Sequence, residues 1–224
     1  VNFKGARSVG GLRESFIHLH IEGVDDAARR AEIVAALERV LADVYVCVED
    51  WQPMLARIRG VIAELRENPP PLPVEEIAEA IQFLEWIAED NFTLLGARDF
   101  AFTARGEVLE PTFETGLGLL RSREARSLQR WNEPLTMTPE IRAFLEEPKL
   151  LVVTKSTVRS PVHRRVQLDY IGVKRFDRAG KLVGEHRFCG LFTSTAYTHP
   201  ARTIPYLRRK TDSIIRRAGF DPSS

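Results

Sequence analysis

The first quarter of the chain shows two different hydrophobic periods. Apolar and polar residues alternate over residues 15 to 22, which predicts a half-buried strand. Beyond Asp25 and Asp26, either of which can serve as an N-cap, apolar residues recur every three or four positions, as in a helix. A β-branched run over residues 44 to 48 then favours a second strand. We therefore expect a unit of strand, helix and strand at the start of the chain.

A helical seam and a proline-rich segment follow this unit. From about Trp51 to Glu67 the apolar residues keep a spacing of three and four, at Met54, Leu55, Ile58, Val61, Ile62 and Leu65. Residues 68 to 73 (NPPPLP) cannot continue that helix, because proline lacks a backbone donor and favours an extended backbone. We therefore place a domain boundary at residues 68 to 73, between regions 1–67 and 74–224.

The second region is expected to contain a helix followed mainly by strands. Glu75 and Glu76 suit the positive end of a helix, whose apolar stripe is Ile77, Ile81, Leu84 and Ile87. A pair of strands is expected over residues 92 to 109, and a strand-rich stretch over residues 149 to 197. Together with the first region, this pattern predicts an α+β fold with an antiparallel sheet and flanking helices.

Local turn and cap signals add detail to this second region. Thr138 is a good N-cap and Pro139 a good first helical residue, so a helix is expected to begin there. Residues 177 to 180 predict a hairpin turn, since glycine at its end can take a positive φ. A last helix is expected from about residue 203 to 218, with Gly219 as its C-terminal cap.

Charge and composition exclude several classes of protein. The 224 residues include 32 basic and 31 acidic side chains, so no overall field favours nucleic acid or an anionic membrane. No apolar run approaches the roughly 20 residues that span a bilayer, and the start lacks a signal-peptide pattern. Cys47 and Cys189 lie in apparent strands, without metal-ligand spacing, which indicates unpaired thiols in a cytoplasmic protein. Because the chain starts with Val1 and ends abruptly, we expect it to be part of a longer polypeptide.

Signals for catalysis, cofactor binding or metal binding are weak. Residues 115 to 120 contain two glycines but lack the third glycine and the Lys-Ser/Thr pair of a phosphate loop, so we expect a turn at the start of a strand rather than bound NAD. His18 and His20 share a strand face, but no third metal ligand accompanies them. No serine lies in a nucleophile-elbow pattern. We expect neither a catalytic site nor a bound cofactor or metal in this chain.

The best candidate site is a basic loop that is expected to connect two strands. Its charged members are Lys155, Arg159, His163, Arg164 and Arg165, interspersed with hydroxyl groups. Arginine forks match carboxylate or phosphate groups, so the loop is able to bind an anionic effector. Two alternatives remain open, a contact with an acidic surface of another domain and a loop that is simply solvated.

Several stretches of the second region resemble the N-terminal segment of the large bacterial NAD-specific glutamate dehydrogenases. The stretches are Phe83–Gly96, Gly116–Leu120, Leu151–Ser156, Ser160–Arg164, Leu168–Phe176, Gly190–Tyr197 and Ile204–Ser224. They cover most of residues 80 to 224, whereas residues 14 to 67 match mainly in pattern. The resemblance implies a parent enzyme that oxidises L-glutamate to 2-oxoglutarate and ammonia with NAD, with its catalytic domain much further along the polypeptide.

The resemblance also implies an architecture and partners. Residues 1–67 are similar to part of an ACT-like domain and residues 74–224 to a PAS-like module, joined by the linker 68–73. The implied role is regulation or oligomer assembly without catalysis, and the alternatives are a purely structural arm and a small self-contained enzyme. The expected partners are other domains and subunits of a homo-oligomeric dehydrogenase, and an amino acid or another small anionic effector.

The ACT-like interpretation leaves half of a sheet to be supplied. An ACT-like domain needs two strand, helix and strand units, and the sequence indicates only one. A two-stranded sheet with open edges is too small to be stable alone, so a partner is expected to complete it. We favour a preceding part of the same polypeptide over a second copy of the chain, since neighbours in sequence are usually neighbours in space.

Overall fold

The computed structural model describes residues 17–123, 128 and 131–219. By its internal contacts the chain divides into two units, Val1–Leu37 and Glu38–Ser224. In the first unit, residues 17 to 26 have no regular secondary structure, and helix α1 (Ala27–Glu49) begins after them. The Asp26 carboxylate caps this helix by accepting a 2.9 Å hydrogen bond from the Ala28 N–H, so the prediction that Asp25 or Asp26 caps a helix is confirmed.

The strand predicted at residues 15 to 22 is wrong over the six of these residues that the structure describes. Ile17, Leu19 and Ile21 are exposed, and no strand pairs with them within the described chain. Alternation produces a strand only where a neighbour accepts and donates the backbone hydrogen bonds, and none does so here. Residues 15 and 16 lie outside the described residues.

The second strand of the predicted unit, at residues 44 to 48, is also wrong. These residues form the last turns of α1, and Cys47 is the helix residue that becomes buried. The reason is visible in the spacing, because Leu41, Val44 and Val48 continue the three-and-four period of the preceding turns. The pattern of strand, helix and strand that supported an ACT-like half domain is therefore not found in the described residues.

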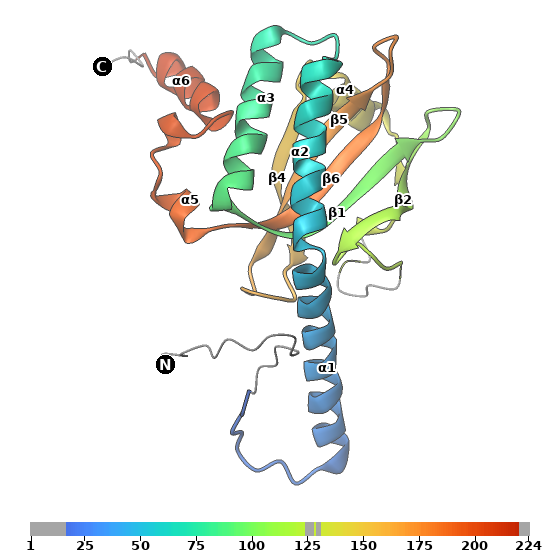
Figure 1. Ribbon diagram of the computed structural model, residues 1–224, viewed down its shortest axis with the longest axis vertical. Coiled ribbons are helices and arrows are strands. Elements are labelled where there is room, and N and C mark those ends of the chain that lie inside the picture. The colour runs from blue at the N-terminus through green and yellow to red at the C-terminus, as the bar shows by residue number, and fades with distance from the viewer. Residues whose placement is uncertain (1–16, 124–127, 129–130, 220–224) are drawn as a thin grey trace, which may run out of the picture. The chain divides into compact units, whose positions relative to one another are not determined.

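The second unit is built on one antiparallel sheet of six strands. They are β1 (Phe92–Phe102), β2 (Val108–Gly118), β3 (Leu135–Thr136), β4 (Leu151–Arg159), β5 (Gln167–Phe176) and β6 (Leu182–Phe192). Their order is β3-β2-β1-β6-β5-β4, which places the first and last strands of the chain side by side in the middle (Figure 1). The α+β fold, the strand pair from residue 92 and the strand-rich stretch after residue 149 are thus confirmed, although β2 extends further than expected.

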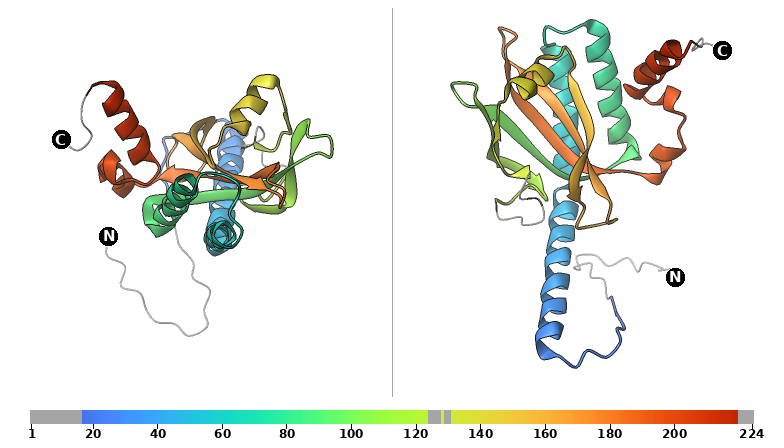
Figure 2. Two further views of the ribbon diagram at one scale, coloured as in Figure 1. Left: turned by 90° about the horizontal axis from the view of Figure 1, so that it is seen from above. Right: turned by 180° about the vertical axis from the view of Figure 1, so that it is seen from behind.

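Helices lie on both faces of this sheet. Their bounds are α2 (Trp51–Glu67), α3 (Val74–Trp86) with the π-helical turn η1 (Ile87–Asn91), α4 (Pro139–Glu146), α5 (Ser194–Thr198), the 3-10 turn η3 (Ala201–Thr203) and α6 (Leu207–Arg217). Figure 2 shows α2 and α3 against one face and α4 against the other. No helix in the described ranges is long and apolar enough to cross a membrane.

Most of the predicted helix ends are confirmed. α2 has the expected bounds, and Thr138 caps α4 by accepting a hydrogen bond from the Ile141 N–H at 3.3 Å. Gly180 in the β5–β6 hairpin has a φ of 81°, and Gly219 after α6 has a φ of 82°. The last helix starts four residues later than expected, because Pro205 cannot donate a backbone hydrogen bond and Tyr206 has a positive φ.

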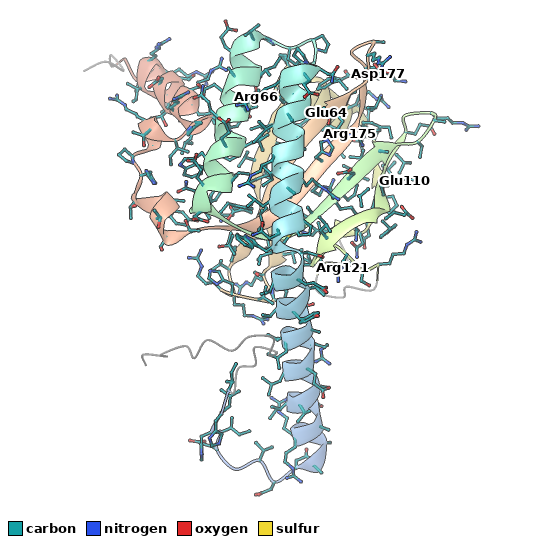
Figure 3. All side chains as sticks on the ribbon, in the orientation of Figure 1. Glu64, Arg66, Glu110, Arg121, Arg175 and Asp177 are labelled. Carbon is teal, nitrogen blue, oxygen red and sulfur yellow. The ribbon has the colours of Figure 1, made fainter. Side chains whose placement is uncertain are left out.

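A buried carboxylate fastens the turn between α1 and α2 to the end of β2. Asp50 is 2% exposed and accepts a 2.7 Å hydrogen bond from the Gly118 N–H. Arg121, labelled in Figure 3, pairs with Asp50 and also with Glu49. Because Gly118 ends β2 and donates its N–H to Asp50, residues 115 to 118 complete this strand and residues 119 and 120 form the turn after it, so the glycines lie at the end of a strand and not at its start.

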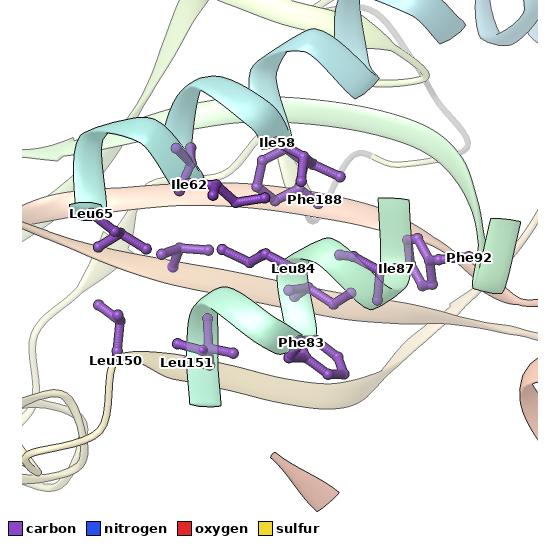
Figure 4. Close-up of a cluster of buried hydrophobic side chains, with 14 of the residues drawn as sticks. Ile58, Ile62, Leu65, Phe83, Leu84, Ile87, Phe92, Leu150, Leu151 and Phe188 are labelled. Carbon is purple, nitrogen blue, oxygen red and sulfur yellow. The ribbon is translucent and has the colours of Figure 1, made fainter. Parts of the chain in front are cut away.

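The main core lies between the sheet and the two helices that flank the proline-rich segment. α2 contributes Met54, Ile58, Val61, Ile62 and Leu65, α3 contributes Ile77, Ala80, Phe83 and Leu84, and the strands add Leu151, Ile171, Val173 and Phe188 (Figure 4). The expected linker at residues 68 to 73 therefore connects two helices of the same core. The compact units divide instead between Leu37 and Glu38.

Candidate functional site

The most distinctive feature of the second unit is a pocket on the sheet face opposite α2 and α3. It has a volume of about 650 Å³ and lies between β4, β5, β6, α4 and Trp131. Ile171, Val173 and Phe188 point into the main core, so their strand neighbours Tyr170, Glu185 and Arg187 face the pocket. The pocket therefore has charged groups on its floor.

A hydrogen-bonded group of three side chains forms this floor. One carboxylate oxygen of Glu185, Oε1, accepts hydrogen bonds from the Tyr170 hydroxyl and, at 2.8 Å, from Arg187 Nε. The Arg187 guanidinium also stacks on Phe100, 3.5 Å from the ring centroid, which is a favourable cation–π arrangement. The three side chains thus provide hydrogen-bond partners for one another inside the protein and fix one another's orientation.

A glycine on the neighbouring strand makes room for this contact. Gly172 lies directly opposite Arg187 in the sheet. A Cβ at this glycine would lie 2.9 Å from the Tyr170 hydroxyl oxygen and 3.0 Å from the Glu185 carboxyl carbon. The absence of a side chain at residue 172 therefore allows Tyr170 and Glu185 to meet.

Burial and the neighbouring charges both shift the pKa values of Arg187 and Tyr170 in the floor. Burial opposes the positive charge of Arg187, but the adjacent Glu185 and Tyr170 raise its pKa overall. Burial, together with the negative charge of Glu185, raises the pKa of the Tyr170 hydroxyl, which keeps its proton and remains a donor. The floor consequently holds a charged guanidinium beside a neutral phenol.

A second buried arginine lies beside the floor. Arg98 bonds to the Leu120 carbonyl and to the Asn132 side chain. Burial and the nearby charge of Arg187 lower the pKa of Arg98 to about 10. Its contacts hold the chain after β2 against the sheet, so we assign Arg98 a structural part in shaping the pocket.

The wall of the pocket is apolar and is held in place by a buried lysine. Trp131, Phe144 and Leu145 lie on this wall, the last two on α4. Lys174 of β5 donates hydrogen bonds to the carbonyls of Leu145, at 2.5 Å, and Glu147, at 2.8 Å. Because these carbonyls end the helix, a cation is favourable there and fixes α4 to the sheet.

Three lysines contribute to the rim of the pocket, and two of them are already paired with carboxylates. Lys149, Lys155 and Lys210 all contribute to the lining. Lys155 also pairs with the buried carboxylate of Asp169 at 2.7 Å, and Lys210 lies over the Tyr206 ring. With an electrically balanced floor, an apolar wall and the ammonium group of Lys210 at the rim, the pocket suits a small organic anion with an apolar part.

The five side chains of the predicted basic loop do not form one site. Lys155 lies on β4 and lines the pocket, whereas Arg159 ends the same strand and is exposed. His163 has a φ of 64° and lines a separate apolar groove beside α1. Arg164 donates a 2.6 Å hydrogen bond to the Phe192 carbonyl, and Arg165 is exposed. Of the five, Lys155 is the one that contributes to the candidate site.

The other weak candidates gain no support in the described part of the chain. Cys47 and Cys189 are free and buried, and burial raises the pKa of both thiols, that of Cys47 to about 12. Cys47 lies in a helix rather than the expected strand. The rings of His18 and His20 are 4.7 Å apart, yet no group of three metal-binding side chains occurs among the described residues.

The sequence analysis missed the floor of the pocket. The signal was present in the segment Gly184–Gly190, where Glu185, His186 and Arg187 interrupt an otherwise apolar strand. Charged residues in a central strand must find partners. Which partners they find depends on the strand order and register, which pattern alone does not supply.

Comparison with known proteins gives matches along nearly the whole chain. No model of a protein family matches it. A protein named NAD-specific glutamate dehydrogenase from Halomonas elongata is 34% identical over 213 residues, which cover 94% of this chain and 13% of the relative. Relatives of the same name from Pseudomonas aeruginosa and Mycobacterium tuberculosis are 33% and 26% identical over 97% and 95% of the chain. The chain spans 12 to 13% of the length of these relatives.

Proposed function

The chain belongs to the NAD-specific glutamate dehydrogenase family, of which it matches one segment, and from this premise we propose that it is a non-catalytic regulatory segment. The whole protein would oxidise L-glutamate to 2-oxoglutarate and ammonia with NAD, and the residues that perform that reaction would lie elsewhere in it. The pocket above the Tyr170, Glu185 and Arg187 floor carries this proposal. It would bind a small anionic effector such as an amino acid or another organic acid.

Three features of the pocket support an effector site. Its volume of about 650 Å³ falls within the range of small-molecule sites in proteins. Its polar groups converge on the floor while its walls are apolar, which is the usual composition of such sites. Its wall includes α4, an eight-residue helix that is attached to the sheet through Lys174. A ligand contacting α4 could therefore change the position of a surface helix.

We also propose that the second unit is PAS-like, as the resemblance implies. An antiparallel sheet with helices on both faces and a pocket on one face agrees with that assignment. The ACT-like assignment of the first region has no such support, because its expected strands are not found in the described residues. Other domains and subunits of the dehydrogenase remain the proposed partners.

A ligand screen tests the proposal on the chain itself. Amino acids, 2-oxo acids and other small organic acids would be added in turn, and the melting temperature and calorimetric binding measured. A ligand that binds only the folded chain raises its stability, by about 2.7 kcal/mol at one hundred times its Kd. Thr154 on β4 is exposed and lines the pocket, so Thr154→Trp should fill the pocket and abolish binding.

A matched control separates pocket filling from general damage. Thr136 on β3 is also an exposed strand threonine, but it is not among the lining residues. Thr136→Trp should therefore bind the effector as the unchanged chain does. If no compound in the screen stabilises the chain, the regulatory proposal is wrong and a purely structural arm becomes the better interpretation.

The alternative of a small self-contained enzyme makes a different prediction. It requires measurable NAD binding or glutamate oxidation by the chain alone. We expect neither, because the glycines at residues 116 and 118 lie at the end of a strand and the Gly118 N–H is already bonded to Asp50. Calorimetric titration with NAD and an absorbance assay for NADH decide the point, and turnover above a buffer control would favour the enzyme.

A further inference from the structure

A groove on the helical side of the sheet contains two buried nitrogens without partners. The groove has a volume of about 820 Å³ and lies between the last turns of α2, residues 68 to 71, the β5–β6 hairpin and His186 of β6. Arg175 Nε and His186 Nε2 are both buried, and neither has a hydrogen-bond partner among the described residues. This groove is separate from the effector pocket, which lies on the opposite face.

One of the two nitrogens belongs to an imidazole with a fixed orientation. His186 Nδ1 lies 2.9 Å from an oxygen of Asp99, so Nδ1 carries a hydrogen and donates it to the carboxylate. Burial alone would raise the pKa of Asp99, but the hydrogen bond and charge of His186, with the charges of Arg57 and Arg175, lower it overall. Asp99 therefore stays ionised and directs Nε2 away from itself, toward the groove.

The register of the sheet brings the second nitrogen to the same place. His186 lies directly opposite Val173 on β5, and Arg175 is two residues further along that strand. Side chains two residues apart on a strand point to the same face, so Arg175 and His186 are diagonal neighbours. Figure 3 shows Arg175 and Asp177 toward the hairpin end of β5, beside Glu64 on α2.

The charges around the groove depend on the proton of His186. Arg57 and Glu64 of α2, Asp99 of β1 and Arg175 of β5 include two cations and two anions, and Asp177 and Arg178 in the hairpin balance each other. Lys174 is also counted among the lining residues, but its ammonium group bonds to the carbonyls near α4 on the other face. The cluster is thus neutral with a neutral imidazole and carries one positive charge with an imidazolium.

Glu64 is the nearest acceptor for His186 Nε2, and it does not fill the site. Its carboxylate oxygen is 3.6 Å from Nε2, which is longer than a hydrogen bond. The Glu64 side chain is 58% exposed and is free to move toward solvent. An acceptor with a better position would therefore compete with Glu64 without breaking a buried contact.

We propose that Arg175 and His186 form a binding site for an oxyanion, a carboxylate or a phosphate group, in this groove. Both partnerless nitrogens are donors when His186 is protonated, and the oxygens of one carboxylate or phosphate group accept from two such donors at once. The imidazolium form donates from Nε2, whereas the neutral form with its hydrogen on Nδ1 does not, so protonation of His186 strengthens binding. The oxyanion is either a free small molecule or an acidic side chain from another part of the whole protein.

Inorganic phosphate is the probe for the free-anion source. Histidine ring signals would be followed by NMR during phosphate titrations of the chain at pH 6 and pH 8, at constant ionic strength. His186→Asn would identify the His186 signals among those of the five histidines. We expect a saturable shift of the His186 signals, because an imidazolium donates from Nε2 whereas a neutral imidazole with its hydrogen on Nδ1 does not. No saturable shift at pH 6 would overturn the proposal.

Variants separate a specific site from attraction to positive charge. Arg175→Lys keeps the charge but removes the Nε donor, so it should weaken phosphate binding. Arg66 on α2 pairs with Glu85 outside the groove, and Arg66→Gln is the control that removes one charge without affecting binding. Glu64→Gln removes the competing carboxylate and should tighten binding. Weakening by Arg66→Gln without weakening by Arg175→Lys would mean general electrostatic attraction and would overturn the site.

The full-length protein distinguishes the two sources of the oxyanion. If the natural ligand is a free small molecule, the full-length protein binds phosphate at His186 as the chain alone does. If an acidic side chain occupies the groove, phosphate binding is lost in the full-length protein and the His186 signals already match those of the phosphate-bound chain. Loss of binding with His186 signals like those of the phosphate-free chain would contradict both forms of the proposal.

Discussion

At the scale of single residues, the opposite charges of Arg187 and Glu185 in the floor of the pocket compensate each other. Arg187 and Glu185 have side chains that are 10% and 5% exposed, so neither charge is solvated by water to any useful extent. An ion pair in such a place contributes little compared with a well-packed apolar pair, but either charge left alone is costly. The pair therefore adds little net stability, although the loss of either partner is costly.

This reasoning predicts unequal effects of single and double substitutions on the floor. Arg187→Leu should lower the free energy of unfolding by about 3–5 kcal/mol, because Glu185 would remain as an uncompensated buried charge. The double variant with Glu185→Leu should lose less than the sum of the two single losses, and equilibrium unfolding in urea measures all three. Additive losses would show that the two charges are independently solvated and that the floor is not coupled.

Asp99 gives a prediction about acid stability. Because its pKa is lowered in the folded chain, the carboxylate adds stability above its unfolded pKa of about 3.9. That contribution is lost as the pH falls from about 5 through 3.9 and the folded pKa. Asp99→Asn should therefore be less stable than the unchanged chain at pH 7 and should lose less further stability between pH 5 and pH 3. Parallel pH curves from urea unfolding would contradict this assignment.

At the scale of elements, Lys174 links a surface helix to the sheet. Its side chain is buried, and burial lowers its pKa, yet the last carbonyls around α4 accept its hydrogen bonds. Lys174→Met keeps the length of the side chain but removes the charge and the donors. The anchoring of α4 is thus separable from the packing of β5.

We expect Lys174→Met to cost about 2 kcal/mol, the order of hydrogen bonds to a charged group, and to loosen α4 in particular. Hydrogen exchange resolved by segment should show faster exchange over residues 139 to 147 with little change in β5. Lys149 is the control, because its side chain is 55% exposed and pairs with Glu147 at the surface. Lys149→Met should change neither stability nor exchange by much, and equal effects of both variants would contradict the anchoring role.

The elements that pattern predicts well are those whose local spacing and packing agree. α2 has the expected bounds, because its apolar seam ends at Leu65 and the prolines begin at residue 69. The strand predicted at residues 44 to 48 is wrong, because the small helix penalty of β-branched residues is outweighed when their spacing continues a helical stripe. The floor of the pocket could not be predicted from the pattern for another reason. The neighbours of Glu185 and Arg187 on β5 depend on the strand register, which the sequence pattern does not give. The basic loop, in contrast, is evident from the sequence alone.

At the scale of the whole molecule, the chain is organised around the second unit. In the described residues, every buried apolar side chain lies at or beyond Cys47, and both hydrophobic clusters belong to that unit. The proline-rich segment at residues 68 to 73 marks a turn within one core rather than a gap between two. The stable part of the chain is therefore expected to start near Glu38.

Two truncations test where the stable part begins. Removal of residues 1–37 should leave the melting temperature within a few degrees of that of the whole chain, since none of the described buried apolar residues is lost. Removal of residues 1–67 takes away α2 and its five buried apolar residues. At about 1.5–3 kcal/mol for each buried side chain, that loss is comparable with the whole stability of about 5–15 kcal/mol of an ordinary domain, so this truncation should not fold.

Circular dichroism and thermal melts on both truncations decide between the two boundaries. A cooperative melt of the piece that starts at residue 68, near that of the whole chain, would restore the proline-rich segment as a true domain boundary.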